Sequence, residues 1–509
     1  MTAVSAESST PASSTVEAMD AFDSLNPATG EVVATFPIQT AADAGAAVDK
    51  ARDAASWWRE LEDKQRRDVL LRWRSELVRR TDELAELIHR ENGKTIPDAT
   101  VEVSLAIAHL NWAAVNARKI LGRRSVRPGI LAPNHQATLE YLPFGVVGVI
   151  GPWNYPVHTP MGSISYALAA GNAVVFKPSE FTPAIGAWLV DSFAPLVEHR
   201  PVLTLLTGLG ETGAALCRAG VDKLAFTGSA RTGQRVMAAC AETLTPCVVE
   251  CGGKDPLIVA ADADLDLAAG QAVWGAMFNA GQTCAGVERV YVEAPVYDEF
   301  VRRLTAHAHD VHTGRPDAEY GPITMPGQLD IIARHIDSAL ADGGRAIVGG
   351  PESVRTPYVE PVVLVDVPED SAAVTEETFG PVVVVTRVAD EAEAIRLANG
   401  TRYGLGASVF SRRRGGRIAE QLDAGMVSVN SVLTYASIPG LPWGGSKDSG
   451  FGRIHGPDGL HEFARSRAIT RQRFAIPLNV TRFGAGDKAI TQLQQLVKAR
   501  WGRARGARL

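Results

Sequence analysis

Residues 202–241 read VLTLLTGLGETGAALCRAGVDKLAFTGSARTGQRVMAACA. The β-prone run Val202–Leu206 ends at a glycine-rich turn, and a helical segment follows that turn. The same order returns immediately, with the strand-like Leu224–Thr227, the turn Gly228–Gly233 and the helical pattern Gln234–Ala241. Strands that alternate with helices pair in parallel, and the helices cover both faces of the sheet. The stretch therefore predicts an α/β fold built on a mostly parallel sheet.

The same alternation extends through most of the chain. Residues 41–122 come first and have helical periodicity. The strand pattern restarts after Gly253, so we expect two α/β domains with a boundary near residues 250–255. The further β-prone runs are Val146–Ile150, Ala173–Phe176, Cys247–Val249, Pro256–Val259, Arg289–Val292, Ala346–Val348, Val362–Val365, Val382–Val385, Ala407–Phe410 and Met426–Val429.

Length and composition narrow the class of protein. A chain of 509 residues is too long for one hydrophobic core, so two or three domains are expected. The net charge of -6 gives no general attraction to nucleic acid, and no run of 18 apolar residues predicts a membrane span. Residues 1–20 are small and polar and are expected to form a disordered tail rather than a secretory signal.

The cysteines and histidines indicate neither disulfides nor a metal site. Five cysteines without a Cys-x-x-Cys pair are typical of free thiols in a reducing cytosol, so we expect a cytoplasmic protein. His307, His309 and His312 form the one cluster of histidines along the sequence. Charged neighbours make it resemble a solvated helix end, and no metal site is expected there.

Two glycine-rich turns are candidates for binding phosphate. Gly208–Gly213 matches G-x-G-x-x-G, but the acidic residue expected about 20 residues later is missing. A turn without phosphate contact explains it equally well. Gly228–Gly233 also follows a strand and opens a helix, where Ser229 can cap the helix and donate to phosphate. These residues alone do not decide between the two turns.

A thiol and a carboxylate are candidates for carbonyl chemistry. Cys284 lies in Gly281-Gln282-Thr283-Cys284, where small neighbours leave space beside the sulfur, although buried cysteine is also a common core residue. A thiol with an ordinary pKa is a few per cent ionised at neutral pH, so we expect a local device that lowers the pKa of Cys284. A helix N-terminus or the charge of a bound cofactor can do this.

Glu250 occupies a hydrophobic strand on the face opposite Cys247, Val249 and Cys251. Burial raises the pKa of a carboxylate towards the useful range of a general base. The structural alternative is an ion pair with a nearby lysine, for example Lys254 or Lys177.

Trp153-Asn154-Tyr155 follows the strand Val146–Ile150. An amide there can donate to a developing oxyanion, or the segment is an ordinary turn.

Seven segments, in this order, resemble the NAD(P)-dependent aldehyde dehydrogenase superfamily. The resemblance covers about residues 25 to 470, most of the chain. The segments are Gly151-Pro152-Trp153-Asn154-Tyr155-Pro156, Lys177-Pro178-Ser179-Glu180, Phe226-Thr227-Gly228-Ser229, Glu250-Cys251-Gly252-Gly253-Lys254, Gly281-Gln282-Thr283-Cys284, Glu377-Thr378-Phe379-Gly380-Pro381 and Pro442-Trp443-Gly444-Gly445-Ser446-Lys447.

The resemblance implies a mechanism and a cofactor site. Cys284 would attack the aldehyde to form a thiohemiacetal and then a thioester, Asn154 would form the oxyanion hole with the backbone N–H of Cys284, and Glu250 would activate the hydrolytic water. The cofactor would be NAD, with NADP tolerated, because Glu180 would repel a 2′-phosphate while its neighbours leave room. The implied cofactor-binding residues are Trp153, Lys177, Ser179, Glu180, Gly208, Gly228, Ser229, Gly233, Cys251, Glu377 and Phe379.

Within that set the resemblance assigns separate roles. Lys177 and Glu377 would hold the riboses, and Phe379 would pack beside the nicotinamide ribose. Ser229 would contact the pyrophosphate, and Gly233 would let the following helix approach. The turn at Gly208 would lie nearer the adenine.

The family fold implies a Rossmann-type cofactor domain, an α/β catalytic domain and a small oligomerisation flap. The cofactor domain, with a five-stranded sheet, would comprise residues 21–124 and 144–250, and the catalytic domain residues 251–458. The flap would comprise residues 125–143 and 459–475, so that a homodimer or homotetramer is expected.

Three positions depart from the family pattern. Cys251 replaces the usual leucine and is expected to be an oxidation-sensitive bystander beside the base. Asp255 replaces the usual asparagine. Gly162 stands where an aromatic residue often lines the substrate tunnel, which indicates a wider entrance unless a loop refills the space.

Two other functions compete with aldehyde oxidation by hydrolysis. A CoA-acylating aldehyde dehydrogenase would transfer the acyl group to CoA, but such relatives typically lack the base, and Glu250 favours hydrolysis. A catalytically silent structural relative is disfavoured by the presence of Cys284, Glu250 and Asn154 together. Neither the motifs nor the composition identifies the aldehyde.

The tail at residues 481–509 lies beyond the family core. It is rich in lysine and arginine, and Ile490, Leu493, Val497 and Trp501 recur at helical spacing. A basic amphipathic helix can rest on an anionic membrane surface, which would make the protein membrane-peripheral. The alternatives are a strap across a neighbouring subunit and a disordered tail.

Overall fold

The computed structural model describes residues 20–476, 483 and 486–502. One compact unit holds the described residues up to Ile120 together with Pro143–Arg465, and a second holds Leu121–Leu142 and the described residues from Ser466 onward. The predicted disordered tail, residues 1–20, lies outside the described residues except for Asp20. Residues 481–482, 484–485 and 503–509 of the predicted basic tail lie outside them as well.

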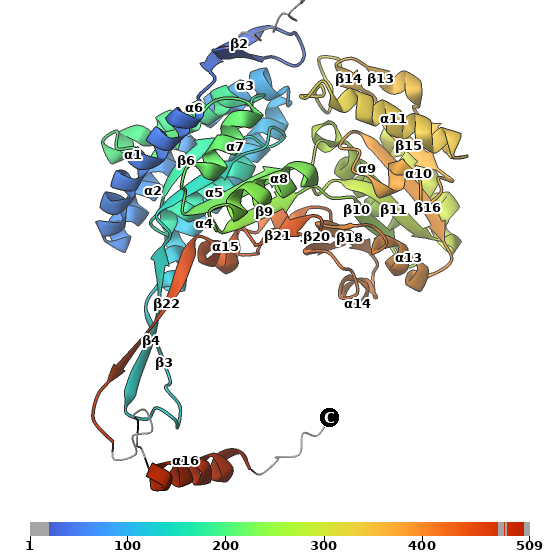
Figure 1. Cartoon of the computed structure of the whole chain (residues 1–509). Helices are drawn as coiled ribbons and strands as arrows, with labels where there is room; N and C mark the ends of the chain where they lie inside the picture. The colour runs from blue at the N-terminus through green and yellow to red at the C-terminus, as the bar shows by residue number, and fades with distance from the viewer. Residues whose placement is uncertain (1–19, 477–482, 484–485, 503–509) are drawn as a thin grey trace, which may run out of the picture. The chain divides into compact units, whose positions relative to one another are not determined.

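The first unit contains a six-stranded sheet of five parallel strands and one antiparallel edge strand (Figure 1). Its strand order is β21-β9-β8-β5-β6-β7. This arrangement confirms the mostly parallel sheet that the alternation of strands and helices predicts. The strands are β5 (Val146–Ile150), β6 (Ala173–Lys177), β7 (Leu203–Leu205), β8 (Lys223–Gly228), β9 (Cys247–Cys251) and β21 (Gly450–Phe451).

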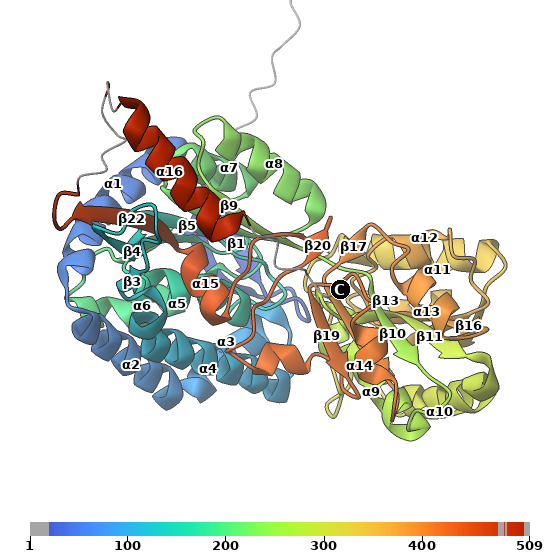
Figure 2. The same ribbon diagram turned by 90° about the horizontal axis from the view of Figure 1, so that it is seen from below.

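Helices cover both faces of this sheet, which explains why its central strands are mostly apolar and buried. Figure 2 shows α7 and α8 on one side of β5 and β9, and α5 and α6 on the other. The first helix begins at a capping box, in which Thr40 and Asp43 exchange hydrogen bonds. The helices of this half are α1 (Ala41–Glu60), α2 (Asp63–Arg79), α3 (Thr81–Asn92), α4 (Ile96–Leu121), α5 (His158–Ala169), α6 (Pro183–Phe193), α7 (Gly210–Arg218), α8 (Ala230–Ala241) and α15 (Gly456–Glu462).

A seven-stranded sheet forms the other half of the first unit, and the chain enters it directly after β9. Its order is β12-β15-β16-β11-β10-β18-β19, parallel except for the edge strand β12. In Figure 1, α9, α10 and α11 lie on one side of this sheet and α13 and α14 on the other.

The strands of the second sheet are β10 (Asp255–Val259), β11 (Val287–Glu293), β12 (Arg345–Val348), β15 (Val362–Val365), β16 (Val382–Val388), β18 (Gly406–Phe410) and β19 (Met426–Val429). Its helices are α9 (Leu265–Met277), α10 (Tyr297–His309), α11 (Gln328–Ala341), α12 (Ala372–Thr375), α13 (Glu391–Ala398) and α14 (Gly415–Ala419). Short two-stranded pairs complete the unit: β1 (Ala21–Leu25) with β2 (Val32–Pro37), β13 (Val354–Arg355) with β14 (Tyr358–Val359), and β17 (Tyr403–Gly404) with β20 (Ser446–Lys447).

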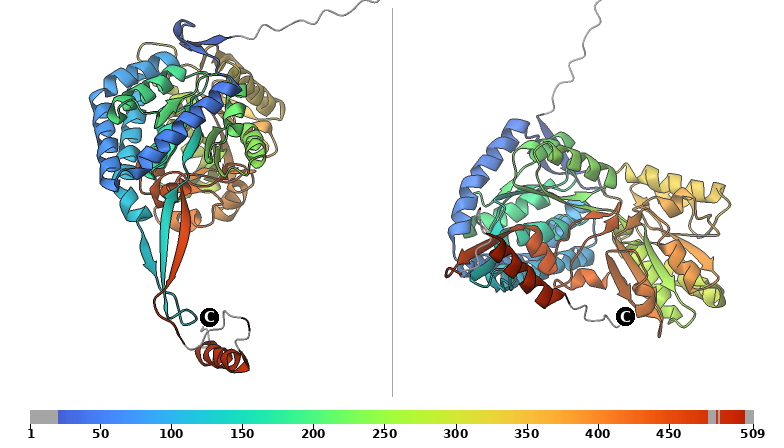
Figure 3. Two further views of the ribbon diagram at one scale, coloured as in Figure 1. Left: turned by 60° about the vertical axis from the view of Figure 1, so that its left-hand side comes forward. Right: turned by 60° about the horizontal axis from the view of Figure 1, so that its bottom comes forward.

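The second unit contains a three-stranded sheet in the order β22-β4-β3. The left-hand view of Figure 3 shows these strands, β3 (Arg124–Val126), β4 (His135–Pro143) and β22 (Ala464–Gln472), running side by side. An ion pair joins Arg467 on β22 to Glu140 on β4. The segments predicted as a flap, residues 125–143 and 459–475, include β4, β22 and all of β3 except Arg124, and their role in oligomerisation stays a prediction.

A final helix, α16, spans Gly486–Trp501. It contains the apolar positions whose spacing predicts a helix in the tail. Ile490, Val497 and Trp501 are exposed along it. None of the helices described is long and apolar enough to cross a membrane.

Candidate active site

A cavity of about 810 Å³ opens at the carboxyl ends of β5, β6, β8 and β9. Open α/β sheets bind ligands at this edge, because parallel strands bring their ends together there. Gly208, Gly233 and Glu250 lie within two residues of its lining. The predicted site residues that line the cavity are Trp153, Asn154, Lys177, Ser179, Glu180, Gly228, Ser229, Cys251, Cys284, Glu377 and Phe379.

The turn Gly228–Gly233 forms one wall of the cavity and begins α8. Ser229 caps this helix, because its hydroxyl oxygen accepts a hydrogen bond from the backbone N–H of Thr232 at 3.3 Å. A Cβ atom at Gly233 would lie 3.0 Å from Cys251 Sγ and from Val249 Cγ1. Glycine at this position therefore lets α8 pack closely on β9, with its N-terminus beside the cavity.

The other turn, Gly208–Gly213, faces the same cavity. Gly208 has a φ of 147°, and a Cβ atom there would lie 2.1 Å from Thr212 Oγ1. Gly210 and Gly213, on the first turn of α7, line the cavity. The two turns that the sequence leaves as alternatives therefore both border one site.

Two charged side chains that can bind ribose hydroxyls, Lys177 and Glu377, line the same cavity. Lys177 donates from Nζ to the carbonyl oxygen of the following residue at 3.0 Å and lies 4.0 Å from Glu180 Oε2. Glu377 accepts a hydrogen bond from the backbone N–H of Gly253 at 3.1 Å. Burial raises the pKa of Glu377 to about 8.

The groups around the cavity fit a dinucleotide. A Cβ atom at Gly252 would lie 1.8 Å from Glu377 Oε1, so the absence of a side chain at Gly252 leaves the space that this carboxyl group occupies. The rings of Trp153 and Phe379, which both line the cavity, meet edge to face with centroids 5.4 Å apart. Helix N-termini and glycine turns can bind phosphates, a lysine can bind ribose hydroxyls, and an aromatic pair can pack against a flat ring.

Cys284 and Glu250 meet beside this cavity although 34 residues separate them in the chain. The Cys284 thiol lies 3.8 Å from Glu250 Oε1. The same oxygen accepts a hydrogen bond from Trp443 Nε1 at 2.6 Å, and Thr227 donates to the other oxygen at 3.4 Å. Lys254 is paired with Glu288, so the structural alternative of an ion pair between Glu250 and Lys254 is not the arrangement found.

Burial raises the pKa of Glu250 to about 7, and hydrogen bonds from Trp443, Thr227 and Cys284 act in the opposite direction. A carboxyl group with this pKa is half ionised near neutral pH, where a general base works best. It is ionised above pH 7 and protonated below it. The base form is therefore lost as the pH falls through about 7.

Substitution Trp443→Phe is expected to shift the acidic limb of the pH–activity profile to higher pH. Phenylalanine keeps an aromatic ring but removes the N–H that stabilises the ionised form of Glu250, so the pKa of Glu250 rises by roughly one unit. The measurement is kcat against pH for the wild type and the variant. A limb that stays at the same pH would show that Glu250 does not control it.

The expectation of a lowered thiol pKa is wrong for the free protein. Burial raises the pKa of Cys284, and the charges of Glu250 and Glu377 raise it further. Cys284 follows the short 3-10 turn Phe278–Gly281 and does not stand at a helix N-terminus. The thiol therefore needs a base, and Glu250 lies within reach of its proton.

Asn154 reaches the cavity from the loop that follows β5. Its side-chain amide donates to the carbonyl oxygen of Gln282 at 2.9 Å, which anchors it two residues from Cys284. An amide group has two N–H bonds, so the second can donate to an oxyanion. The backbone oxygen of Asn154 accepts hydrogen bonds from Lys94 and Asn279.

A buried ion pair behind Asn154 was not foreseen from the sequence. Lys94 and Glu102 are paired, and both side chains are fully covered. Lys94 Nζ donates to the backbone oxygen of Asn154 at 2.6 Å, and Glu102 accepts from the backbone N–H groups of Val157 and His158. The pair thus fixes the loop that presents the amide. Its two members are eight residues apart, but their partners lie more than 50 residues away, so no local pattern identifies them.

The structure decides two expectations that were based on departures from the family pattern, at Cys251 and at Gly162. Burial, followed by the charge of Glu250, raises the pKa of Cys251 to about 12, so its thiol stays protonated and is not expected to be oxidation-sensitive. The space at Gly162 is refilled by a loop: a Cβ atom there would lie 2.5 Å from His455 Nε2 and 3.1 Å from Ile454 Cδ1. The wider entrance is therefore absent, and the refilling alternative holds.

The family model for the aldehyde dehydrogenase family matches residues 15–469. The 4,4'-diapolycopene aldehyde oxidase of Methylomonas sp. is 39% identical over 464 residues, which cover 90% of this chain and 87% of that protein. An NADP-dependent enzyme of E. coli has a crystal structure that superposes with a TM-score of 0.85, at 33% identity over 89% of this chain and 95% of that one. Betaine aldehyde dehydrogenase from Staphylococcus aureus in complex with NAD+ has a TM-score of 0.85 at 31% identity, over 91% of this chain and 93% of that one.

The chain therefore belongs to the aldehyde dehydrogenase family. It is an NAD(P)-dependent aldehyde dehydrogenase with the α/β fold of that family, as the seven sequence segments predict.

Proposed function

We propose that this enzyme converts an aldehyde to a free carboxylic acid, with Cys284 as the nucleophile and Glu250 as the base. A bound nicotinamide dinucleotide supplies the hydride acceptor. Glu250 takes the thiol proton as Cys284 Sγ bonds to the carbonyl carbon, and the amide of Asn154 stabilises the oxyanion. After oxidation the acyl group remains on Sγ as a thioester. Glu250 then releases the first proton to solvent and takes a proton from the water that attacks the thioester carbon. The C–S bond breaks, the free acid leaves, and Cys284 regains a proton.

The contact between Cys284 Sγ and Glu250 Oε1 at 3.8 Å carries this proposal. It places a base with a pKa of about 7 beside the sulfur that would hold the acyl group. A CoA-acylating enzyme needs a thiol acceptor and no such base. The silent relative is disfavoured by the joint presence of nucleophile, base and amide at one cavity.

The test is an assay of NADH absorbance with a panel of aldehydes, with and without CoA. The panel should include short aliphatic aldehydes and 4,4'-diapolycopene aldehyde, the compound in the name of the Methylomonas relative. Turnover without CoA, with free acid as the product, is expected. Turnover only with CoA would establish the acylating alternative, and no turnover with any aldehyde would favour the silent one.

The enzyme is expected to prefer NAD while tolerating NADP. Glu180 stands at the cavity rim, 4.0 Å from Lys177, where its charge would repel a 2′-phosphate or accept from a 2′-hydroxyl. The substitution Glu180→Gln keeps the size and removes the charge. The ratio of kcat/KM for NAD to that for NADP is expected to fall roughly tenfold. A wild-type kcat/KM that is clearly higher with NADP would contradict the assignment.

The C-terminal helix can determine either the oligomeric state or the contact of the enzyme with a membrane. We infer a homodimer or homotetramer from the family resemblance. The exposed Ile490, Val497 and Trp501 on α16 suit a strap across a neighbouring subunit or a contact with an anionic membrane. A protein that ends at Val480 is compared with the full chain. Loss of sedimentation with anionic liposomes on truncation would support the membrane contact, and a smaller oligomer without lipid binding would support the strap.

A further inference from the structure

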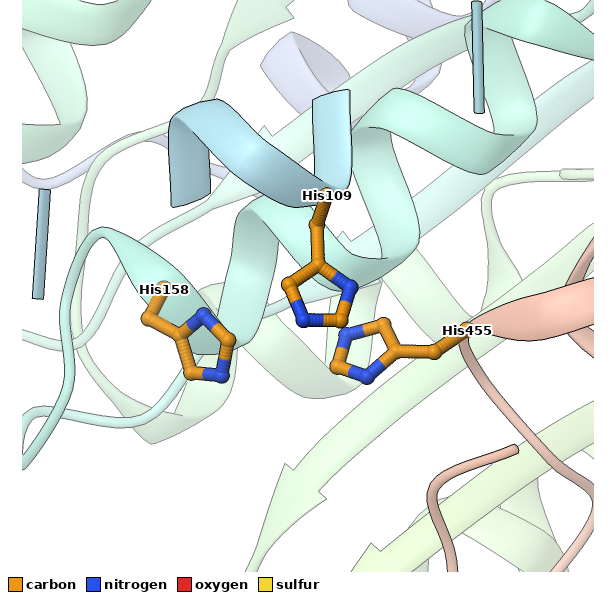
Figure 4. A group of neighbouring side chains, drawn as sticks. All are labelled: His109, His158 and His455. Atoms are coloured by element: carbon orange, nitrogen blue, oxygen red, sulfur yellow. The ribbon is translucent and has the colours of Figure 1, made fainter. Parts of the chain in front are cut away.

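Three buried histidines from distant parts of the chain meet beside the active site. His109 lies on α4, His158 is the first residue of α5, and His455 directly precedes α15. Figure 4 shows their rings coming together from these elements. One nitrogen of each ring lies within 4.8 Å of a nitrogen of the other two. The sequence does not suggest this group, because 297 residues separate its middle and last members, unlike the cluster at 307–312.

Each ring has one nitrogen that no hydrogen bond satisfies within the described structure. These atoms are Nδ1 of His109, Nδ1 of His158 and Nε2 of His455. The side chains are 0%, 8% and 2% exposed. Buried polar atoms normally have a partner, so three orphaned nitrogens in one cluster call for an explanation.

A hydrogen bond to His109 leaves its other ring nitrogen available as a metal ligand. His109 Nε2 lies 3.0 Å from the carbonyl oxygen of Ala436. A carbonyl only accepts, so Nε2 carries the hydrogen and Nδ1 keeps a free lone pair. A neutral imidazole is the form that binds metal ions.

The backbone holds His455 in place at a conformational cost. Its φ of 65° and ψ of 164° fall in a region that is almost restricted to glycine. The missing side chain at Gly162 leaves the space that His455 Nε2 occupies. Strain of this kind is typical of residues whose position serves a function.

Ring packing alone leaves the orphaned nitrogens unexplained. The rings of His109 and His455 are tilted by 37° with centroids 3.7 Å apart, and the ring of His158 lies 5.2 Å from that of His109. Contact between the rings stabilises their packing but supplies no hydrogen-bond partner for the orphaned nitrogens. A zinc ion lies about 2.0–2.1 Å from each imidazole nitrogen, so tetrahedral ligands are separated by roughly 3.3 Å. One nitrogen of each ring lies within 4.8 Å of the others in the structure, so metal binding would require the rings to turn and draw closer.

We propose that His109, His158 and His455 form a three-histidine site for a divalent transition-metal ion of the zinc class. Imidazole suits zinc, cobalt and nickel, and three protein ligands leave a position open for water or a ligand oxygen. The ring of His455 lies 6.1 Å from that of Trp443, whose N–H holds Glu250. The side chain of Trp443 thus lies between the proposed metal site and the candidate base, Glu250.

The test uses the full-length protein and the metal ions alone. Zn2+ titrated by calorimetry is expected to bind with one equivalent per chain and to raise the Tm. X-ray absorption of the zinc-loaded protein is expected to show imidazole ligands at about 2.0–2.1 Å. Co2+ is expected to give visible bands of a four-coordinate ion, without the charge-transfer band of a thiolate ligand.

The variant His455→Gly removes one ligand and places glycine where the backbone already favours it, so folding is retained. Zn2+ affinity is expected to fall at least tenfold, and the shift in Tm with Zn2+ to disappear. His309→Ala, which removes an exposed histidine of the cluster at 307–312, is the matched control and should bind as the wild type does. The second variant, Gly162→Ala, keeps all three rings, but its methyl group would displace His455 Nε2, so weaker binding is expected.

Three results would overturn the site. These are the absence of Zn2+ binding by the wild type, equal affinity in the wild type and His455→Gly, and a cobalt spectrum with a thiolate band that disappears in Cys284→Ser. The last would place the ion on the nucleophile.

Discussion

Replacement of Cys284 by alanine is expected to abolish aldehyde oxidation while cofactor binding survives. The residue supplies the sulfur that would hold the acyl group, and the nearest basic group, Glu250, contacts that sulfur. Without the thiol, water would have to attack the aldehyde directly, and the covalent route would be lost. We expect kcat to fall below about a hundredth of the wild-type value.

The matched control is Cys247→Ala, which changes a half-buried cysteine on β9 that is not part of the cavity lining. This control should keep most of the activity. Cofactor binding by calorimetry and the circular dichroism spectrum show whether Cys284→Ala remains folded. If Cys284→Ala retains more than about a hundredth of the wild-type kcat, the nucleophile is another residue.

Replacement of Glu250 by glutamine is expected to stop the enzyme at the thioester. Glutamine keeps the volume and an oxygen that can accept from Trp443, but it does not take a proton from water. Oxidation of the thiohemiacetal needs no water, whereas release of the acid does. A burst of about one equivalent of NADH per active site, followed by slow turnover, is the expected time course.

The structure adds a second readout to this experiment. Glu250 also lies 3.8 Å from the thiol, so it can accept the proton of Cys284 as well as that of water. If it does both, the burst in Glu250→Gln keeps its amplitude but becomes slower. Intact-mass spectrometry of the stalled protein should show the acyl adduct. Unchanged steady-state turnover would mean that Glu250 is a structural residue.

The sheets could be predicted from the sequence because their strands are buried on both faces. β15 contains only valine and leucine between polar turns, and the expected run Val362–Val365 coincides with it. β9 runs from Cys247 to Cys251 and so extends beyond the apolar run Cys247–Val249 to include Glu250, as its expected place on the strand requires. The carboxylate is tolerated there because three neutral donors satisfy it.

The site residues could be predicted only where they lie in short motifs. Trp443 lies in the motif Pro442–Lys447, yet its role depends on a contact with Glu250, which is 193 residues away in the chain. The pKa of Cys284 could not be anticipated, because it depends on burial and on carboxylates brought in by folding. Local sequence identifies chemical groups, whereas the electrostatic environment of those groups arises from tertiary structure.

The antiparallel edge strand β21 lies near the end of the chain, so it is synthesised long after the strand β9 with which it pairs. Gly450 pairs with Glu250, and the backbone N–H of Cys251 donates to the carbonyl oxygen of Ser449. Translation proceeds from the N-terminus, so a nascent chain carries Glu250 and Cys284 long before these partners emerge. The backbone pairing around Glu250 can form only after residue 451 has been synthesised, and chains that terminate earlier are expected to be released without activity.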